Sequence, residues 1–158
     1  MANLAAPIKR DWNISVESRT IADQVPSGGI FPTQATVPSG TTIYKGGLYC
    51  INASGVIVVP DTSASTFAIG IFEGWTSAGG YTDTVVGDSA ILVSLTIGAV
   101  WLPNSATNAA TLASLQTTAY AEDSNTVGTV VGSTRRAAGK IIAFDPIRNM
   151  VCVDMTQA

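Results

Sequence analysis

The sequence predicts an all-β fold, a small β-barrel or sandwich with one short helix and an extended N-terminal arm. Short runs of β-prone residues follow one another from residue 42 to residue 75, and small polar turns separate them. Large and small side chains alternate between Phe67 and Ile71, which is the period of a half-buried strand. Helical spacing of apolar residues is almost absent, so the fold class follows from strands and turns.

The first part of the predicted domain has the pattern of an antiparallel meander. Its expected strands cover residues 42–44, 48–51, 56–59 and 67–75. The connection from Asn52 to Gly55 has hairpin length, and Gly55 can adopt the positive φ that residues with a Cβ resist. Pro60 and Asp61 end the third of these strands.

The most apolar stretch of the chain covers residues 89–102, after a short strand expected at 81–86. Its alternating pattern predicts one central strand, in which Gly98 marks a bulge or bend and which Pro103 closes. Residues 104–116 are the one helical candidate, with Asn108 as a possible cap and with Leu112 and Leu115 three apart on one side. Further strands are expected at 118–121, 126–131, 140–144 and 150–154.

Residues 1–35 differ from the rest and form the predicted N-terminal arm, which leaves 36–158 as the β-rich domain. Prolines and a Ser-Gly-Gly break deny this segment a helix, yet it carries too many large apolar residues for a solvated tail. Trp12, Ile14 and Val16 alternate with polar residues, as in an extended strand with one apolar face. Because Trp12 has no local core to enter, we expect it to anchor in a neighbouring subunit.

Composition narrows the classes of function. Of 158 residues, 46% are hydrophobic and 12% charged, and the net charge of -3 argues against nucleic-acid binding. No basic residue occurs between Gly46 and Thr134, so an acidic middle is flanked by basic ends. Cys50 and Cys152 lie in expected strands and are predicted to be buried thiols. Neither a signal peptide nor a bilayer-spanning run is found, which predicts synthesis in the cytoplasm and no membrane partner.

Residues that could carry catalysis are scarce. The chain has no histidine and no phosphate-binding, dinucleotide-binding or nucleophile motif, so we expect no enzyme, metal site or cofactor. Glu122 and Asp123 are interpreted as solvated turn acids, and Glu73 as a surface glutamate. Trp75 and Trp101 end apolar strands, where half-buried core indoles are expected and a carbohydrate-stacking platform is the alternative.

The order of turns and strands from residue 36 to residue 155 resembles the small capsid decoration, or cement, proteins of tailed bacteriophages. The matching segments are Pro38-Ser39-Gly40-Thr41, Tyr44-Lys45-Gly46-Gly47-Leu48, Asn52-Ala53-Ser54-Gly55-Val56, Val59-Pro60, Phe67-Ala68-Ile69-Gly70-Ile71-Phe72-Glu73-Gly74, an apolar strand from Val93 to Leu102, Ala119-Tyr120-Ala121-Glu122-Asp123, Ala137-Ala138-Gly139-Lys140-Ile141-Ile142 and Met150-Val151-Cys152-Val153. The resemblance lies in this succession rather than in a rare motif. The arm, residues 1–35, is longer than in the shortest members.

This resemblance implies a structural virion protein on the outer surface of a phage head, where it clamps neighbouring major capsid subunits as a homotrimer. The residues expected to bind the shell are Ile8, Lys9, Arg10, Trp12, Ile14 and Val16. Two alternatives stay open: a glycan- or receptor-binding module of a head or tail fibre, and a minor capsid or tail-tube subunit.

Overall fold

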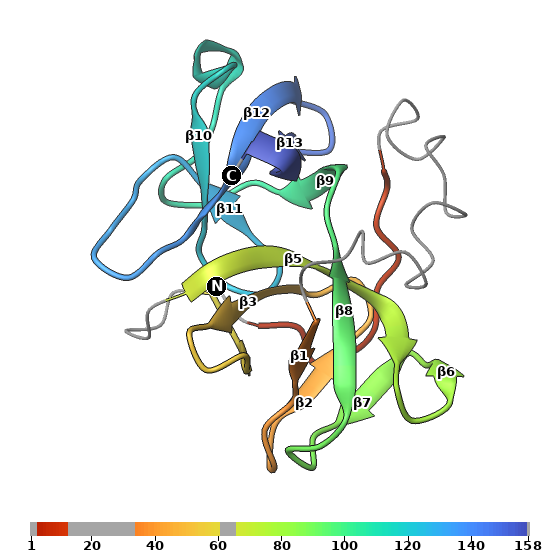
Figure 1. Ribbon diagram of the computed structural model, residues 1–158. Coiled ribbons are helices and arrows are strands. Elements are labelled where there is room, and N and C mark those ends of the chain that lie inside the picture. The colour runs from red at the N-terminus through yellow and green to blue at the C-terminus, as the bar shows by residue number, and fades with distance from the viewer. Residues whose placement is uncertain (1–2, 13–33, 61–65, 158) are drawn as a thin grey trace.

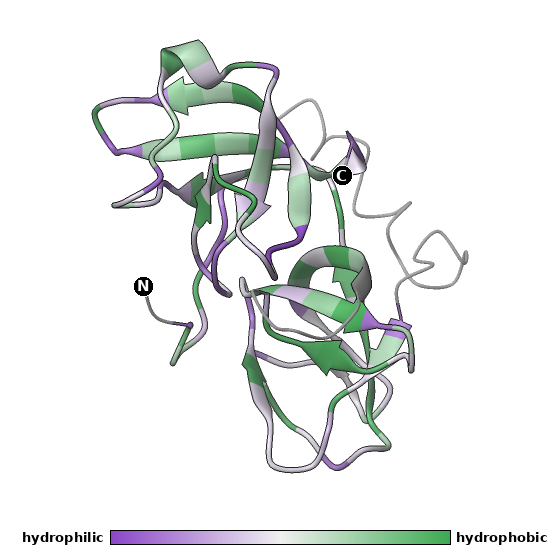
Figure 2. Ribbon diagram, turned by 90° about the vertical axis from the view of Figure 1, so that its left-hand side faces the viewer, coloured by the Kyte–Doolittle hydropathy of each residue, from purple (hydrophilic) through white to green (hydrophobic). Residues whose placement is uncertain are grey.

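A computed structural model describes residues 3–12, 34–60 and 66–157, and it is all-β (Figure 1). The first sheet has the order β1-β8-β5-β3-β4, with β6 paired to β5; the second has the order β11-β10-β12-β13-β9; and β2 pairs with β7. Figure 2 shows the second sheet as a separate layer above the first. The described strands form open sheets packed on one another, so the architecture is a sandwich and not a closed barrel.

The strands of the first sheet are β1 (Gln34–Thr36), β3 (Leu48–Asn52), β4 (Ile57–Val58), β5 (Thr66–Thr76), β6 (Gly80–Tyr81) and β8 (Leu92–Thr96). Those of the second sheet are β9 (Ala99–Pro103), β10 (Thr118–Ala121), β11 (Val127–Gly128), β12 (Ala137–Asp145) and β13 (Met150–Asp154). The ribbon beside the first sheet consists of β2 (Thr42–Tyr44) and β7 (Thr84–Val86), and two short 3-10 helices are η1 (Leu112–Ser114) and η2 (Met155–Gln157). All strand pairs within these sheets are antiparallel.

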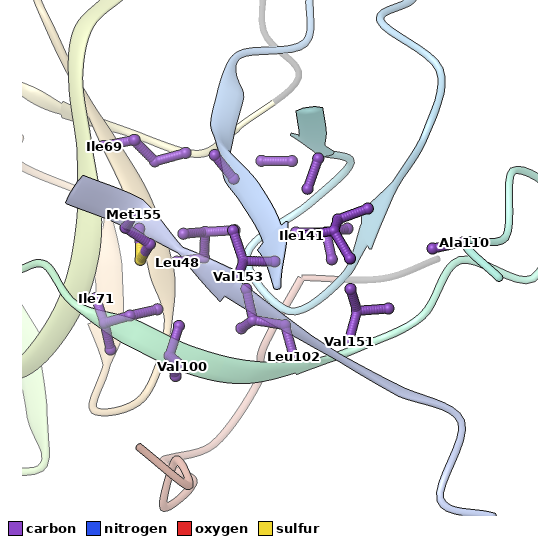
Figure 3. Close-up of a cluster of buried hydrophobic side chains, with 14 of the residues drawn as sticks. Leu48, Ile69, Ile71, Val100, Leu102, Ala110, Ile141, Val151, Val153 and Met155 are labelled. Atoms are coloured by element: carbon purple, nitrogen blue, oxygen red, sulfur yellow. The ribbon is translucent and has the colours of Figure 1, made fainter. Parts of the chain in front are cut away.

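Strand β3 is buried on both faces and supplies both hydrophobic cores. Successive side chains of a strand point to opposite faces, so Leu48 and Cys50 enter the core between the two sheets, while Tyr49 and Ile51 enter the core on the other side. The core between the sheets (Figure 3) consists of Leu48, Cys50, Ile69, Ile71, Val100, Leu102, Ala110, Ala119, Ala121, Val127, Ala138, Ile141, Val151, Val153 and Met155. This explains the continuous apolar run of β3, because neither of its faces meets solvent.

The apolar stretch 89–102 is two strands, which corrects the prediction of a single central strand. Strand β8 pairs with β1 and β5 in the first sheet, whereas β9 pairs with β13 in the second. The chain crosses between the sheets at Ile97 and Gly98, and the amide of Met155 donates a 2.9 Å hydrogen bond to the carbonyl of Gly98. The alternation of apolar residues continues through residues 89–102 because β8 and β9 each bury one face, although they belong to different sheets. Pro103 is the last residue of β9 and does not lie beyond it.

The helical candidate shrinks to a single 3-10 turn. Thr111, not Asn108, caps it: the Thr111 hydroxyl accepts from the amide of Ala113, and the Ser114 hydroxyl accepts from the amide of Thr111. Leu112 and Leu115 are both exposed, so no apolar contact extends the turn. The short strand expected at 81–86 is likewise divided into β6 and β7. Cys50 and Cys152 are buried thiols, as predicted.

Candidate functional site: the N-terminal segment and its polar junction

Residues 3–12, here called the N-terminal segment, lie along the body of their own chain (Figure 1, red). The amide of Leu4 donates to the hydroxyl of Ser124 at 2.7 Å, in the turn between β10 and β11. The amide of Ile8 donates to the carbonyl of Lys45 at 2.8 Å, in the turn between β2 and β3. Farther along, the amide of Trp101 in β9 donates to the carbonyl of Asp11 at 2.9 Å. The segment therefore joins turns and strands from both layers.

Arg10 is the buried charge at the centre of these contacts. Arg10 is only 5% exposed. Its Nε donates a hydrogen bond to the carbonyl of Gly46 at 2.6 Å, and its Nη2 donates one to Oδ1 of Asn125 at 3.0 Å. Burial lowers the pKa of Arg10 to about 10, because desolvation disfavours the cation, while the carboxylates of Glu73 and Asp123 act in the opposite direction. At neutral pH the guanidinium is still charged. It therefore acts as a cation in the polar junction, the name used here for Arg10 together with Gly46 and the turn residues Asp123 and Asn125.

The turn between β10 and β11 supplies the other half of the junction. One carboxylate oxygen of Asp123, Oδ1, accepts from the amides of Asn125 at 2.7 Å and Thr126 at 2.8 Å, which fixes the turn locally. The carbonyl of Ser124 accepts from the amide of Leu48 at 2.8 Å, so the turn is tied to the first sheet. The other oxygen of Asp123, Oδ2, is buried without a hydrogen-bond partner among the described residues, and the charge of Arg10 compensates it.

Glu122 forms a second buried polar group on the far side of the same turn. Its Oε1 accepts from the Ser105 hydroxyl at 2.9 Å and from the Asn108 amide group at 3.1 Å, and it lies 3.5 Å from Nη1 of Arg135. Both Glu122 and Asp123 are thus buried, and the expectation that they are solvated turn acids is wrong. Each has several polar neighbours, as buried charges require: Ser105, Asn108 and Arg135 surround Glu122, while Asp123 has the amides of its own turn and the distant Arg10.

The predicted shell-binding residues occupy several environments. Ile8 is half-buried, Lys9 is exposed and Arg10 is buried; Ile14 and Val16 lie outside the described residues. Trp12 is half-buried. It forms an isolated antiparallel β-bridge with Val100 of β9, and its side chain packs against the core between the sheets. The expectation that Trp12 lacks a core within its own chain is therefore wrong. The sequence signal that could have revealed the junction is the Asp123-Ser124-Asn125-Thr126 run, whose side chains are typical of a self-capping turn.

The tryptophans considered for carbohydrate stacking are placed differently. The Arg148 guanidinium lies over the ring of Trp101, 5.4 Å from its centroid, and so covers one face of the indole. Trp75 is half-buried in β5, opposite Tyr81 of β6. Glu73 is half-buried, with Oε1 buried, and is thus not a plain surface glutamate.

Within residues 3–12, 34–60 and 66–157, no group of three or more Cys, Asp or Glu side chains is placed to hold a metal ion. The same residues contain no helix long and apolar enough to cross a bilayer. The polar groups described above meet one another and the backbone, an arrangement that fixes the relative position of the layers. Comparisons of the chain with known protein families, curated sequences and solved structures yield no match.

Proposed function

We propose that this chain is a structural virion protein that binds the outer surface of a tailed-phage head and clamps neighbouring major capsid subunits, acting as a homotrimer. The observation that carries the proposal is the succession of turns and strands from residue 36 to residue 155, which resembles capsid decoration proteins. A clamp requires a rigid body and adhesive surfaces rather than a catalytic group. The buried polar junction supports the proposal because it makes the body rigid: it ties the N-terminal segment to both layers.

The shell contact is proposed for the outward side of the N-terminal segment. Arg10 and Trp12 are used within the chain, so their contribution is to hold the segment in place. Lys9 lies between Ile8 and Arg10 and is exposed, which leaves its cation available to an acidic surface. Standard interfaces bury about 800 Å² per partner, and three linked copies would raise avidity roughly 10²–10⁴-fold where all engage together.

The test mixes the purified full-length protein with heads of the encoding phage that lack it, followed by sedimentation. We expect the protein to pellet with the heads and to raise their resistance to heat. A protein that stays in the supernatant at saturating concentration would overturn the proposed function.

Point variants test the contact residue separately. Lys9→Glu is expected to weaken head binding, whereas Lys9→Arg, which keeps the positive charge at the same exposed position, should bind as the parent does. Removal of residues 1–20 is unsuitable, because it would also delete the buried Arg10. Equal binding of both variants would reject the N-terminal contact and leave head binding itself intact.

A further inference from the structure

We draw no further inference here: the strongest candidate, the pocket around β6 and β7 with the exposed side chains of Tyr81 and Val86 on its walls, carries none, because nothing in the described part of the chain shows what covers it.

Discussion

The Arg10 side chain donates a 2.6 Å hydrogen bond from Nε to the carbonyl of Gly46, thirty-six positions along the chain. Gly46 has a φ of 86° and lies in the turn between β2 and β3. Its amide donates to the carbonyl of Phe72 in β5 at 2.7 Å, so the same residue is bonded to the first sheet and to the N-terminal segment. This pair of residues is where the segment is fastened to the body.

Replacement of Arg10 by Ala should lower the free energy of unfolding by about 2–4 kcal/mol, because it strands the buried Gly46 carbonyl and leaves the buried carboxylate of Asp123 without its cation. Lys9→Ala, one position away on an exposed side chain, should change it by no more than about 0.5 kcal/mol. Urea unfolding of both variants measures the difference. Equal values for the two would show that the buried guanidinium contributes no net stability.

Gly46→Ala tests the close approach between the segment and the turn. An added Cβ would clash with the carbonyl oxygen of Ile8 and would force Ala into a positive φ. Gly55 also has a positive φ, 75°, but nothing lies within 4 Å of its Cβ position, so Gly55→Ala isolates the backbone cost of about 1–2 kcal/mol. We expect Gly46→Ala to lower the free energy of unfolding by about 1–3 kcal/mol more than Gly55→Ala does.

Hydrogen exchange at the amide of Ile8 gives the local readout for this pair of variants. That amide donates to the carbonyl of Lys45, next to the substituted glycine. Its protection should fall in Gly46→Ala by more than the global stability change accounts for, and should follow global stability in Gly55→Ala. If the protection of this amide followed global stability in Gly46→Ala as well as in Gly55→Ala, the N-terminal segment would not be fastened at this turn.

Local patterns were enough to predict most strands but not the crossings between sheets. Strand β13 was expected at residues 150–154 and has those bounds, because its apolar run is closed on one side by a turn rich in Asp, Pro and Asn. Strands β8 and β9 were merged, since alternation continues through Gly98 and only the distant amide of Met155 reveals a change of sheet. Local periodicity holds no information about which sheet a strand joins.

The polar junction was missed for a related reason. Arg10 was assigned to a partner surface, because a charged side chain in a segment without local structure is ordinarily exposed. Its burial depends on Gly46 and on Asn125, which are 36 and 115 positions away. Trp12 was misjudged in the same way, since its core is made by strands in the second half of the chain.

Asp145 should titrate below its ordinary pKa of 3.8. Arg148 lowers the pKa of Asp145, chiefly by a 2.6 Å side-chain hydrogen bond from Nε and further by its backbone amide. Since the folded pKa is depressed, the stabilisation is present above pH 3.8 and is lost as pH falls through the folded value. In Arg148→Gln the pKa of Asp145 should move up toward 3.8.

Carbon-13 NMR of the carboxyl groups follows this titration directly. Asp88 is the internal control, because its pKa is lowered by the backbone amides of Ala90 and Ile91 and not by Arg148. Its titration should be unaffected by Arg148→Gln. A common shift of both carboxyls would point to a general change in charge rather than to loss of the Asp145–Arg148 pair.

Glu122→Ala should destabilise the fold by about 2–4 kcal/mol. The change removes the acceptor shared by the Ser105 hydroxyl and the Asn108 side chain, and it removes the anion that faces Arg135. Asp83→Ala, at an exposed acid, should stay within about 0.5 kcal/mol of the parent. A double-mutant cycle of Glu122→Ala with Arg135→Ala should give a coupling of about 0.5–3 kcal/mol, measured by urea unfolding.

The same variant should loosen the loop at 129–136, because Arg135 braces the carbonyl of Val130 from a position set by Glu122. Amide exchange in that loop should therefore quicken beyond what the global change in stability predicts. Unchanged exchange in the loop, or a coupling of zero in the cycle, would show that the loop keeps its shape without the buried carboxylate.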